Sequence, residues 1–110
     1  MVKGLQFNPV VKLFFCNESG DSKFSLSPSV VALCRGVRET GSLSGAAYAE
    51  QMSYSKAWTL IKGVEKNMGI QLLVSRGPGG SLLTPECEQL LAVYDETLQS
   101  LQGDADRMVG

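Results

Sequence analysis

The sequence contains no histidine, and its three cysteines, Cys16, Cys34 and Cys87, lie far apart without a Cys-x-x-Cys pair. A zinc site, a disulfide framework and a Cys–His nucleophile each need residues that are missing here. We therefore expect three reduced cysteines that act as small hydrophobic core residues. A phosphate-cradling Gly-x-x-x-x-Gly-Lys motif is also missing. The chain is predicted to have no metal site, no cofactor and no catalytic centre, so it is not expected to be an enzyme.

Long apolar runs are missing as well. The most apolar stretch, around residues 10–16, is interrupted by Lys12 and followed by Asn17, whereas a membrane-spanning helix needs about 20 apolar residues in succession. The first residues, MVKGLQFNPVVK, lack the apolar core and the small-residue cleavage site of a secretory signal. These absences predict a cytoplasmic protein that does not enter a membrane.

Residues 1–110 have the length and composition of one globular domain, with 44% hydrophobic and 19% charged residues. The net charge is only −1, but the charges are distributed unevenly. Residues 52–81 contain four basic residues against Glu65 alone, while residues 85–110 contain six acidic residues against Arg107 alone. Because a partner contacts one face of a protein rather than its net charge, the basic middle segment favours a nucleic-acid partner.

The N-terminal 26 residues are predicted to form a β-hairpin. Residues 10–16 (VVKLFFC) and 22–26 (SKFSL) are rich in β-branched and aromatic residues, and NESGD between them consists largely of turn formers.

Three helices are predicted from start and stop signals in residues 27–69. Ser27 with Pro28 begins the first, which should run to about residue 40 before Gly41. Ser42 or Ser44 begins a short second helix that ends near residue 50 or 51, and its small side chains allow another helix to approach closely. Ser53 begins a third helix that runs to about residue 68.

A second β-hairpin and a last helix follow. Residues 70–75 (IQLLVS) and 81–84 (SLLT) resemble short strands joined by the turn RGPGG. Thr84 with Pro85 begins a helix expected over residues 85–102, followed by a frayed tail at 103–110. The apolar residues of this helix have the alternating spacing of a coiled-coil seam and are Cys87, Leu91, Tyr94, Leu98 and Leu101.

The order of these elements predicts an α+β fold, mostly α. A short helix, a tight turn, a longer helix and a β-hairpin form the layout of a winged helix-turn-helix domain, here over residues 27–84. In that layout the longer helix lies in the major groove of double-stranded DNA, and the hairpin, called the wing, lies on the adjacent backbone or minor groove. The C-terminal helix would then serve dimerisation.

The polar side of the third helix suits DNA. Ser55, Thr59 and Lys62 recur on one side without a carboxylate, and hydroxyl and ammonium groups bind phosphates and base edges. We predict DNA contacts from Ser53, Tyr54, Ser55, Lys56, Thr59 and Lys62, and from Arg76, Gly79, Gly80 and Ser81 in the wing.

Ordinary structural roles compete with several of these assignments. Ser53 serves first as a helix cap, Lys62 alone fits a solvated helix face, and Gly79 with Gly80 can simply form the turn. Trp58 is interpreted as a core residue packed against the small surface of Ala46 and Ala47. The arrangement of all the features together favours DNA binding.

Three segments, ETGSLSGAA, MSYSKAW and GGSLLTPECEQLL, together resemble the DNA-binding domain of ModE-type, molybdate-responsive transcription regulators, whose helix-turn-helix is similar to that of the LysR type. The resemblance extends from about residue 26 to residue 101. It implies a homodimeric DNA-binding regulator. By position, Ser53, Tyr54, Ser55 and Lys56 match the recognition motif and residues 76–81 match the wing.

The sequence departs from that family in three places. Ser55 precedes Lys56 where two adjacent basic residues are common, the wing is shorter, and the chain ends at Gly110 without room for molybdate-binding domains. Weaker or differently specific DNA binding is expected, and oxyanion sensing is not carried over. A stand-alone regulator and a fragment of a longer one both remain open, and the effector is unassigned.

Dimerisation is predicted through Tyr94, Leu98 and Leu101, with packing of the same stripe against the first helix as the alternative. The alternative function is a winged-helix module that binds another protein instead of DNA, because the acidic C-terminal segment and the single lysine at the start of the third helix would also suit that role.

Overall fold

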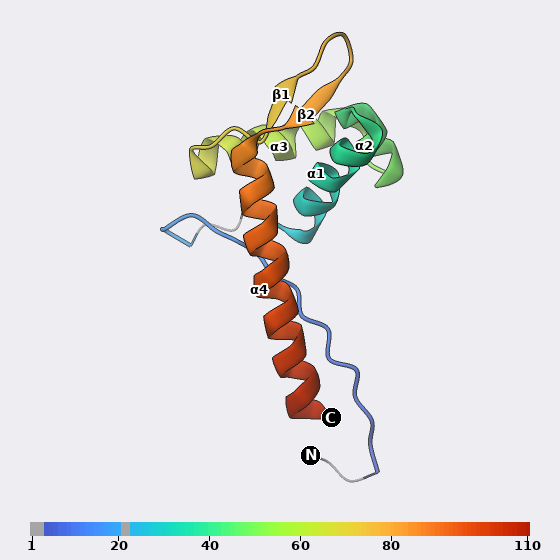
Figure 1. Ribbon diagram of the computed structural model, residues 1–110, viewed down its shortest axis with the longest axis vertical. Coiled ribbons are helices and arrows are strands. Elements are labelled where there is room, and N and C mark those ends of the chain that lie inside the picture. The colour runs from blue at the N-terminus through green and yellow to red at the C-terminus, as the bar shows by residue number, and fades with distance from the viewer. Residues whose placement is uncertain (1–3, 21–22) are drawn as a thin grey trace.

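A long C-terminal helix carries a helical head with a projecting β-hairpin (Figure 1). The computed structural model describes residues 4–20 and 23–110, and its principal extents are 58 × 30 × 22 Å. The elements, in chain order, are α1 (Pro28–Thr40), α2 (Leu43–Ala49), α3 (Tyr54–Met68), β1 (Leu73–Ser75), β2 (Ser81–Leu83) and α4 (Pro85–Val109). The predicted winged helix-turn-helix fold is confirmed.

Each helix begins at a predicted hydroxyl cap. Ser27 and Thr84 precede prolines and accept backbone hydrogen bonds from Val30 and Cys87. Ser42, rather than Ser44, caps α2, and its side chain accepts from the N–H of Gly45. Each cap satisfies one of the backbone donors that a helix start leaves free, which is why these short local signals were reliable.

The helix ends at Gly41 and Gly69 are confirmed too. Gly41, after α1, has φ 82°, and Gly69, after α3, has φ 67°. These left-handed conformations favour glycine because it has no Cβ.

The core lies where α1, α3, the start of β1 and the first part of α4 meet. Leu33, Ile61, Leu72 and Leu91 are among its fully buried side chains. Cys34 and Cys87 are also fully buried, and a hydrogen bond between the two thiols together with burial raises the pKa of Cys34. Cys34 therefore stays protonated and acts as the small core residue that the sequence predicted.

The wing is a two-stranded antiparallel sheet in which Leu73 pairs with Leu83 and Ser75 with Ser81. The N–H of Ser81 donates to the carbonyl of Gly41 at 2.8 Å. This bond joins the wing to the end of α1, so the wing projects from the head at a defined position (Figure 1).

The prediction of an N-terminal β-hairpin is wrong. In the described part of this region, residues 4–20 and 23–26, Phe15 and Leu26 form an isolated bridge and no strand occurs. Residues 21 and 22, at the predicted loop and second strand, lie outside the described residues. The segment before Phe15 instead follows α4 (Figure 1), where Gln102 bonds to the backbone of Pro9 and Val11. Because a side chain takes these backbone groups, they need no partner strand.

The last helix is longer than predicted. It continues through residues 103–109, which were expected to form a frayed tail, and ends at Val109. Gln102 donates to Asp106 at 3.1 Å, and Arg107 pairs with Asp104 one turn earlier. Such pairs stabilise a helix surface, and Gly103 costs too little to stop the helix.

The smooth surface predicted for α2 permits a close approach to α1. A Cβ added to Gly36 on α1 would lie 2.7 Å from the Cβ and 2.9 Å from the Cα of Ala46 on α2. No real Cβ contact is that short against a backbone atom, so the two helices must move apart if Gly36 gains a side chain.

Alanine is therefore expected to have opposite effects at two helical glycines. Gly36→Ala should lower the free energy of unfolding by about 1–3 kcal/mol because of overpacking. Gly103→Ala on α4 meets nothing within 4 Å, and it should raise stability by up to about 1 kcal/mol through helix propensity. Urea denaturation of both variants measures the difference, and equal effects would contradict the close α1–α2 contact.

Candidate nucleic-acid interface

The first turns of α3 present a polar surface to solvent. Ala57, Ile61 and Val64 occupy the buried side of the helix, while residues 53–56 and Thr59 are exposed. The Ser53 hydroxyl accepts from the N–H of Lys56 at 3.1 Å, so it acts first as the cap. Ser55, Lys56 and Thr59 make no hydrogen bond or ion pair through their side chains among the described residues.

Trp58 is not a core residue, so that prediction is wrong. Its side chain is 47% exposed, and its ring stacks on Tyr54 with centroids 6.4 Å apart and an interplanar angle of 22°. The Lys62 Nζ lies 4.6 Å from the Trp58 ring centroid. The four-residue spacing of Tyr54, Trp58 and Lys62 places them on one flank of α3, and that spacing was the missed signal.

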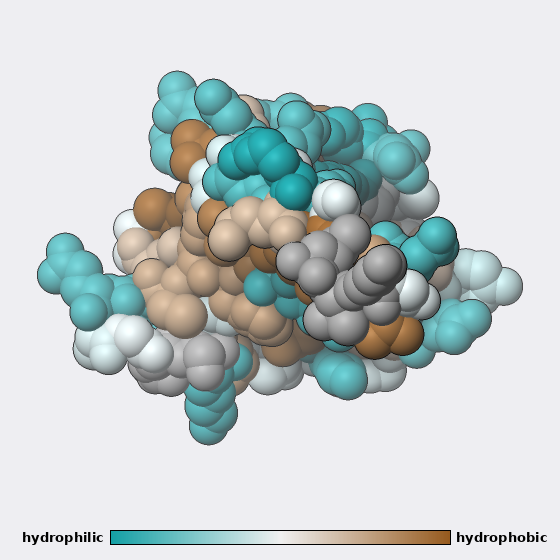
Figure 2. Space-filling model, turned by 90° about the horizontal axis from the view of Figure 1, so that it is seen from below, coloured by the Kyte–Doolittle hydropathy of each residue, from teal (hydrophilic) through white to brown (hydrophobic). Residues whose placement is uncertain are grey.

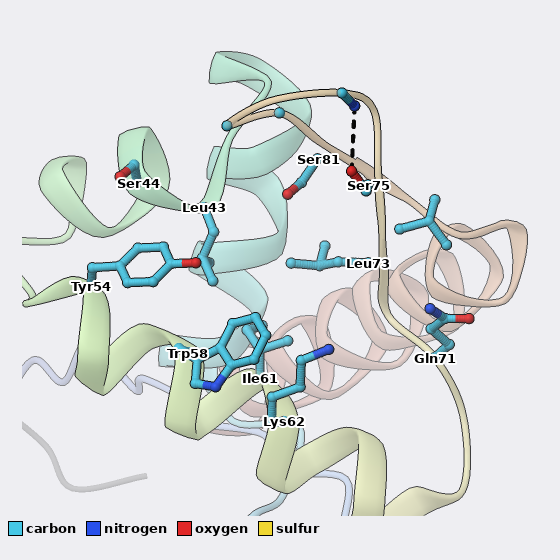
Figure 3. A pocket seen from close by; sticks show the side chains of 14 residues that line it. Leu43, Ser44, Tyr54, Trp58, Ile61, Lys62, Gln71, Leu73, Ser75 and Ser81 are labelled. Carbon is cyan, nitrogen blue, oxygen red and sulfur yellow. Dashed lines mark hydrogen bonds between the residues drawn. The ribbon is translucent and has the colours of Figure 1, made fainter.

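An open groove of about 530 Å³ lies between this flank of α3 and the wing. Figure 3 shows Tyr54, Trp58 and Lys62 rising from α3 on one side and Ser75 and Ser81 on the wing opposite. Apolar side chains lie between the two walls, and Ser44 at the start of α2 also lines the groove. The sequence did not predict this groove, because its two walls come from separate elements.

The glycine-rich turn of the wing forms the rim of the groove. Gly79, Gly80 and Ser81 line it, as does Gly77. Gly77 has φ 118° and Gly79 has φ 71°, so both turn positions favour glycine. Arg76 lies outside the groove, and its guanidinium packs against Gly41. Three of the four predicted wing residues, Gly79, Gly80 and Ser81, therefore line the same groove as the α3 flank.

The Glu65 carboxylate lies beside the polar side of α3. Glu65 Oε1 is 3.1 Å from Lys62 Nζ, while its Oε2 accepts from the N–H of Leu72 at 2.7 Å and of Leu73 at 3.3 Å. The polar side of this helix was expected to hold no carboxylate, but Glu65 lies within ion-pair distance of Lys62. Glu65 is turned toward the backbone that begins the wing, where it links α3 to β1.

The family is decided by a comparison with known sequences. The model of bacterial regulatory helix-turn-helix proteins of the lysR family matches residues 31–88, more than half of the chain. The chain belongs to this family. The matched residues run from α1 to the first turn of α4 and contain the α3–wing groove. Family and fold are those of a DNA-binding transcription regulator domain and not of an enzyme.

A curated relative of this lysR-family domain is the molybdenum-pterin-binding protein MopB of Rhodobacter capsulatus. The two are 32% identical over 68 residues, which cover 58% of this chain and 25% of MopB. The chain thus spans about a quarter of the length of that relative. The resemblance to ModE-type and LysR-type helix-turn-helix regulators is confirmed.

A solved structure with the same fold is the crystal structure of the CbnR_DBD–DNA complex. The TM-score is 0.58 at 23% identity, with 72% of this chain and 90% of the other chain covered.

Within residues 4–20 and 23–110, no helix is long and apolar enough to cross a membrane, and no cluster of His, Cys, Asp and Glu could hold a metal ion.

The three residues predicted for a dimer interface differ in exposure. Tyr94 is 2% exposed, donates its hydroxyl to the carbonyl of Leu13 at 2.7 Å and packs edge-on against Phe15. It is covered by its own chain, so its predicted place at a dimer surface is wrong. Leu98 is half-buried, and Leu101 is 42% exposed.

Removal of the Glu65 carboxylate should loosen the wing of this lysR-family domain. Glu65→Ala leaves the Leu72 and Leu73 N–H groups without their acceptor, which costs about 1–3 kcal/mol of unfolding free energy for a buried donor. Glu65→Gln keeps an acceptor oxygen and loses only the surface ion pair with Lys62, worth about 0–1 kcal/mol. Thermal unfolding compares the two, and amide hydrogen exchange at Leu72 should rise in the alanine variant alone.

Proposed function

We propose that this domain binds double-stranded DNA sequence-specifically as a homodimeric transcription regulator. In this proposal the first turns of α3 lie in the major groove, and the wing, residues 76–81, lies on the adjacent backbone. The observation that carries it is the exposed polar side at the start of α3, which has no carboxylate among residues 53–62, beside a small glycine-rich wing in a lysR-family fold. Base-edge contacts would supply the sequence preference.

The chemistry of the α3 surface supports this function. The hydroxyls of Ser55 and Thr59 can donate to or accept from base edges and phosphates, and Lys56 supplies a positive charge. The N–H groups at the start of α3 favour a phosphate as well. The acidic residues in the second half of α4 lie on a helix that extends away from the wing (Figure 1), where they would not oppose the approach of DNA.

DNA binding is tested with fragments selected from genomic DNA and titrated with salt. Each phosphate that the protein neutralises should contribute a slope of about −0.9 to the plot of log affinity against log salt. Lys56→Gln should weaken binding and reduce that slope by about 0.9. Lys12→Gln, at an exposed lysine on the N-terminal segment, is the matched control and should change neither quantity.

Two results would contradict the proposal. A domain that binds no selected fragment even at low salt does not act through DNA, and the protein-interaction alternative then takes its place. Equal losses for Lys56→Gln and Lys12→Gln would indicate a general charge effect instead of contact through α3.

Dimerisation is proposed along the exposed side of α4. Its buried residues, Cys87, Leu91 and Tyr94, all lie in its first ten residues, whereas Val93 and Leu101 are 55% and 42% exposed. Figure 2, seen from the end of the molecule where α4 ends, shows apolar atoms exposed at this end with hydrophilic atoms around them. A long helix with little tertiary packing gains stability from a partner, which supports a second copy of this chain here.

A charge placed on this side of α4 should dissociate the dimer. Leu101→Glu would bury a carboxylate against the partner, which is costly without a counter-charge. Gln99→Glu adds the same charge at an exposed neighbouring position and should leave the dimer intact. Sedimentation velocity measures the mass of each, and a wild-type monomer at high concentration would rule out the dimer.

A further inference from the structure

We propose that the groove between α3 and the wing holds one sugar–phosphate strand of the DNA duplex, with the Trp58 ring packed on a deoxyribose and Lys62 paired with a phosphate. This inference rests on the proposed DNA binding and assigns a role to Trp58, which sequence analysis placed in the core. It assigns contact with the DNA backbone to one flank of α3, formed by Tyr54, Trp58 and Lys62. The outward residues Ser55 and Thr59 are left to contact the bases.

The position of the groove selects its occupant. If α3 lies in the major groove and the wing lies across the neighbouring backbone, the strand that divides the major from the minor groove must pass between them. The 530 Å³ groove is the open space between those two elements. One wall is the Tyr54–Trp58–Lys62 flank (Figure 3). The other is formed in the wing by Ser75, Gly77, Gly79, Gly80 and Ser81.

The chemistry of the walls matches a sugar–phosphate strand. Lys62 brings a positive charge. Ser81 and Ser75 line the groove from the wing, and the Ser75 hydroxyl accepts from the N–H of Gly77. Most protein hydrogen bonds to DNA go to phosphate and sugar, from lysine, hydroxyl and backbone N–H groups. The glycines at the rim leave room for a backbone to approach closely. The deoxyribose is the apolar part of such a strand, and Trp58 offers a broad apolar ring to it.

Trp58 is held in place before DNA arrives. Tyr54 stacks on one side, and the Lys62 ammonium lies over the ring at 4.6 Å. Tyr54 is 51% exposed and Trp58 is 47% exposed, so much of this aromatic surface faces solvent in the free domain. A rigid, exposed aromatic pair loses little side-chain entropy when a partner covers it. Its exposure therefore fits a surface prepared for contact.

Lys62 can reach a phosphate without disturbing the wing. Its ammonium has three donors, and one is directed to Glu65 Oε1 at 3.1 Å. The second carboxylate oxygen of Glu65 is bound to the Leu72 and Leu73 N–H groups. Glu65 therefore stays with the wing backbone and keeps the charge of Lys62 near the groove.

Trp58 provides its own probe, because it is the single tryptophan of the chain. Addition of a selected DNA fragment to the full domain should change the Trp58 emission and reduce its quenching by acrylamide, as a ring covered by a deoxyribose is less accessible. Both signals should reverse when high salt releases the DNA. If DNA binds by anisotropy while Trp58 emission and quenching stay unchanged, the groove does not hold the strand, although the domain still binds DNA.

Variants separate backbone contact from base reading. Trp58→Ala should weaken binding at least about fivefold, the loss typical of an important interface residue, while Trp58→Phe should retain most affinity. Phe14→Ala, at an exposed aromatic residue of the N-terminal segment, is the control and should bind like the wild type. Circular dichroism should show the same helix content in all four proteins, because Trp58 is not part of the core.

Whether the loss of affinity depends on the DNA sequence decides whether Trp58 contacts the backbone or a base. A backbone contact predicts that Trp58→Ala weakens every fragment in a panel of single base-pair changes by the same factor, and that Lys62→Gln reduces the salt slope by about 0.9. A loss by Trp58→Ala confined to fragments with one particular base pair would overturn the inference in favour of base reading. Absence of binding by the wild type would instead overturn the proposed function.

Discussion

The interface depends on the Glu65 carboxylate, which joins α3 to the start of the wing. Its Oε2 accepts from the Leu72 and Leu73 N–H groups, while its Oε1 pairs with Lys62. Ile61 and Val64 of α3 share one core cluster with Leu72 and Leu73, and this link adds a polar connection between α3 and β1. Because buried backbone donors need an acceptor, the carboxylate sets the separation between the two walls of the groove. The same group also holds the Lys62 ammonium beside Trp58.

Further contacts hold the wing and α1 in place around this link. The wing is bound to the end of α1 through Ser81 and the carbonyl of Gly41, and α1 is packed so tightly on α2 that Gly36 has no room for a side chain. Arg35 of α1 also pairs with Asp95 of α4. The helix-turn-helix, the wing and the base of α4 are therefore connected, and DNA would meet a preformed surface. Preformed surfaces lose less entropy on binding.

The sequence predicted the helix starts, the glycine-ended helices and the wing, because each depends on a signal within a few residues. It failed where distant segments compete for the same groups. Residues 10–16 have the composition of a strand, yet Gln102 and Tyr94 of α4 occupy the backbone groups of Pro9, Val11 and Leu13. The same contacts removed Tyr94 from the predicted dimer surface. Nothing near residue 10 in the sequence indicates that a helix ninety residues later would supply these partners.

The sequence by itself determined the type and order of the elements from α1 to α4, the polar start of α3 and the membership of a regulator family, because caps, turn residues and helical periodicity act locally. Only the tertiary structure decided that Trp58 faces solvent, that Glu65 bonds to the wing and that a groove lies between α3 and the hairpin. The buried side of α3 was already filled by Ala57, Ile61 and Val64, so the larger Trp58 ring lies at the boundary. Helical spacing cannot say which residue at such a boundary is covered, because that depends on the shape of the opposite surface.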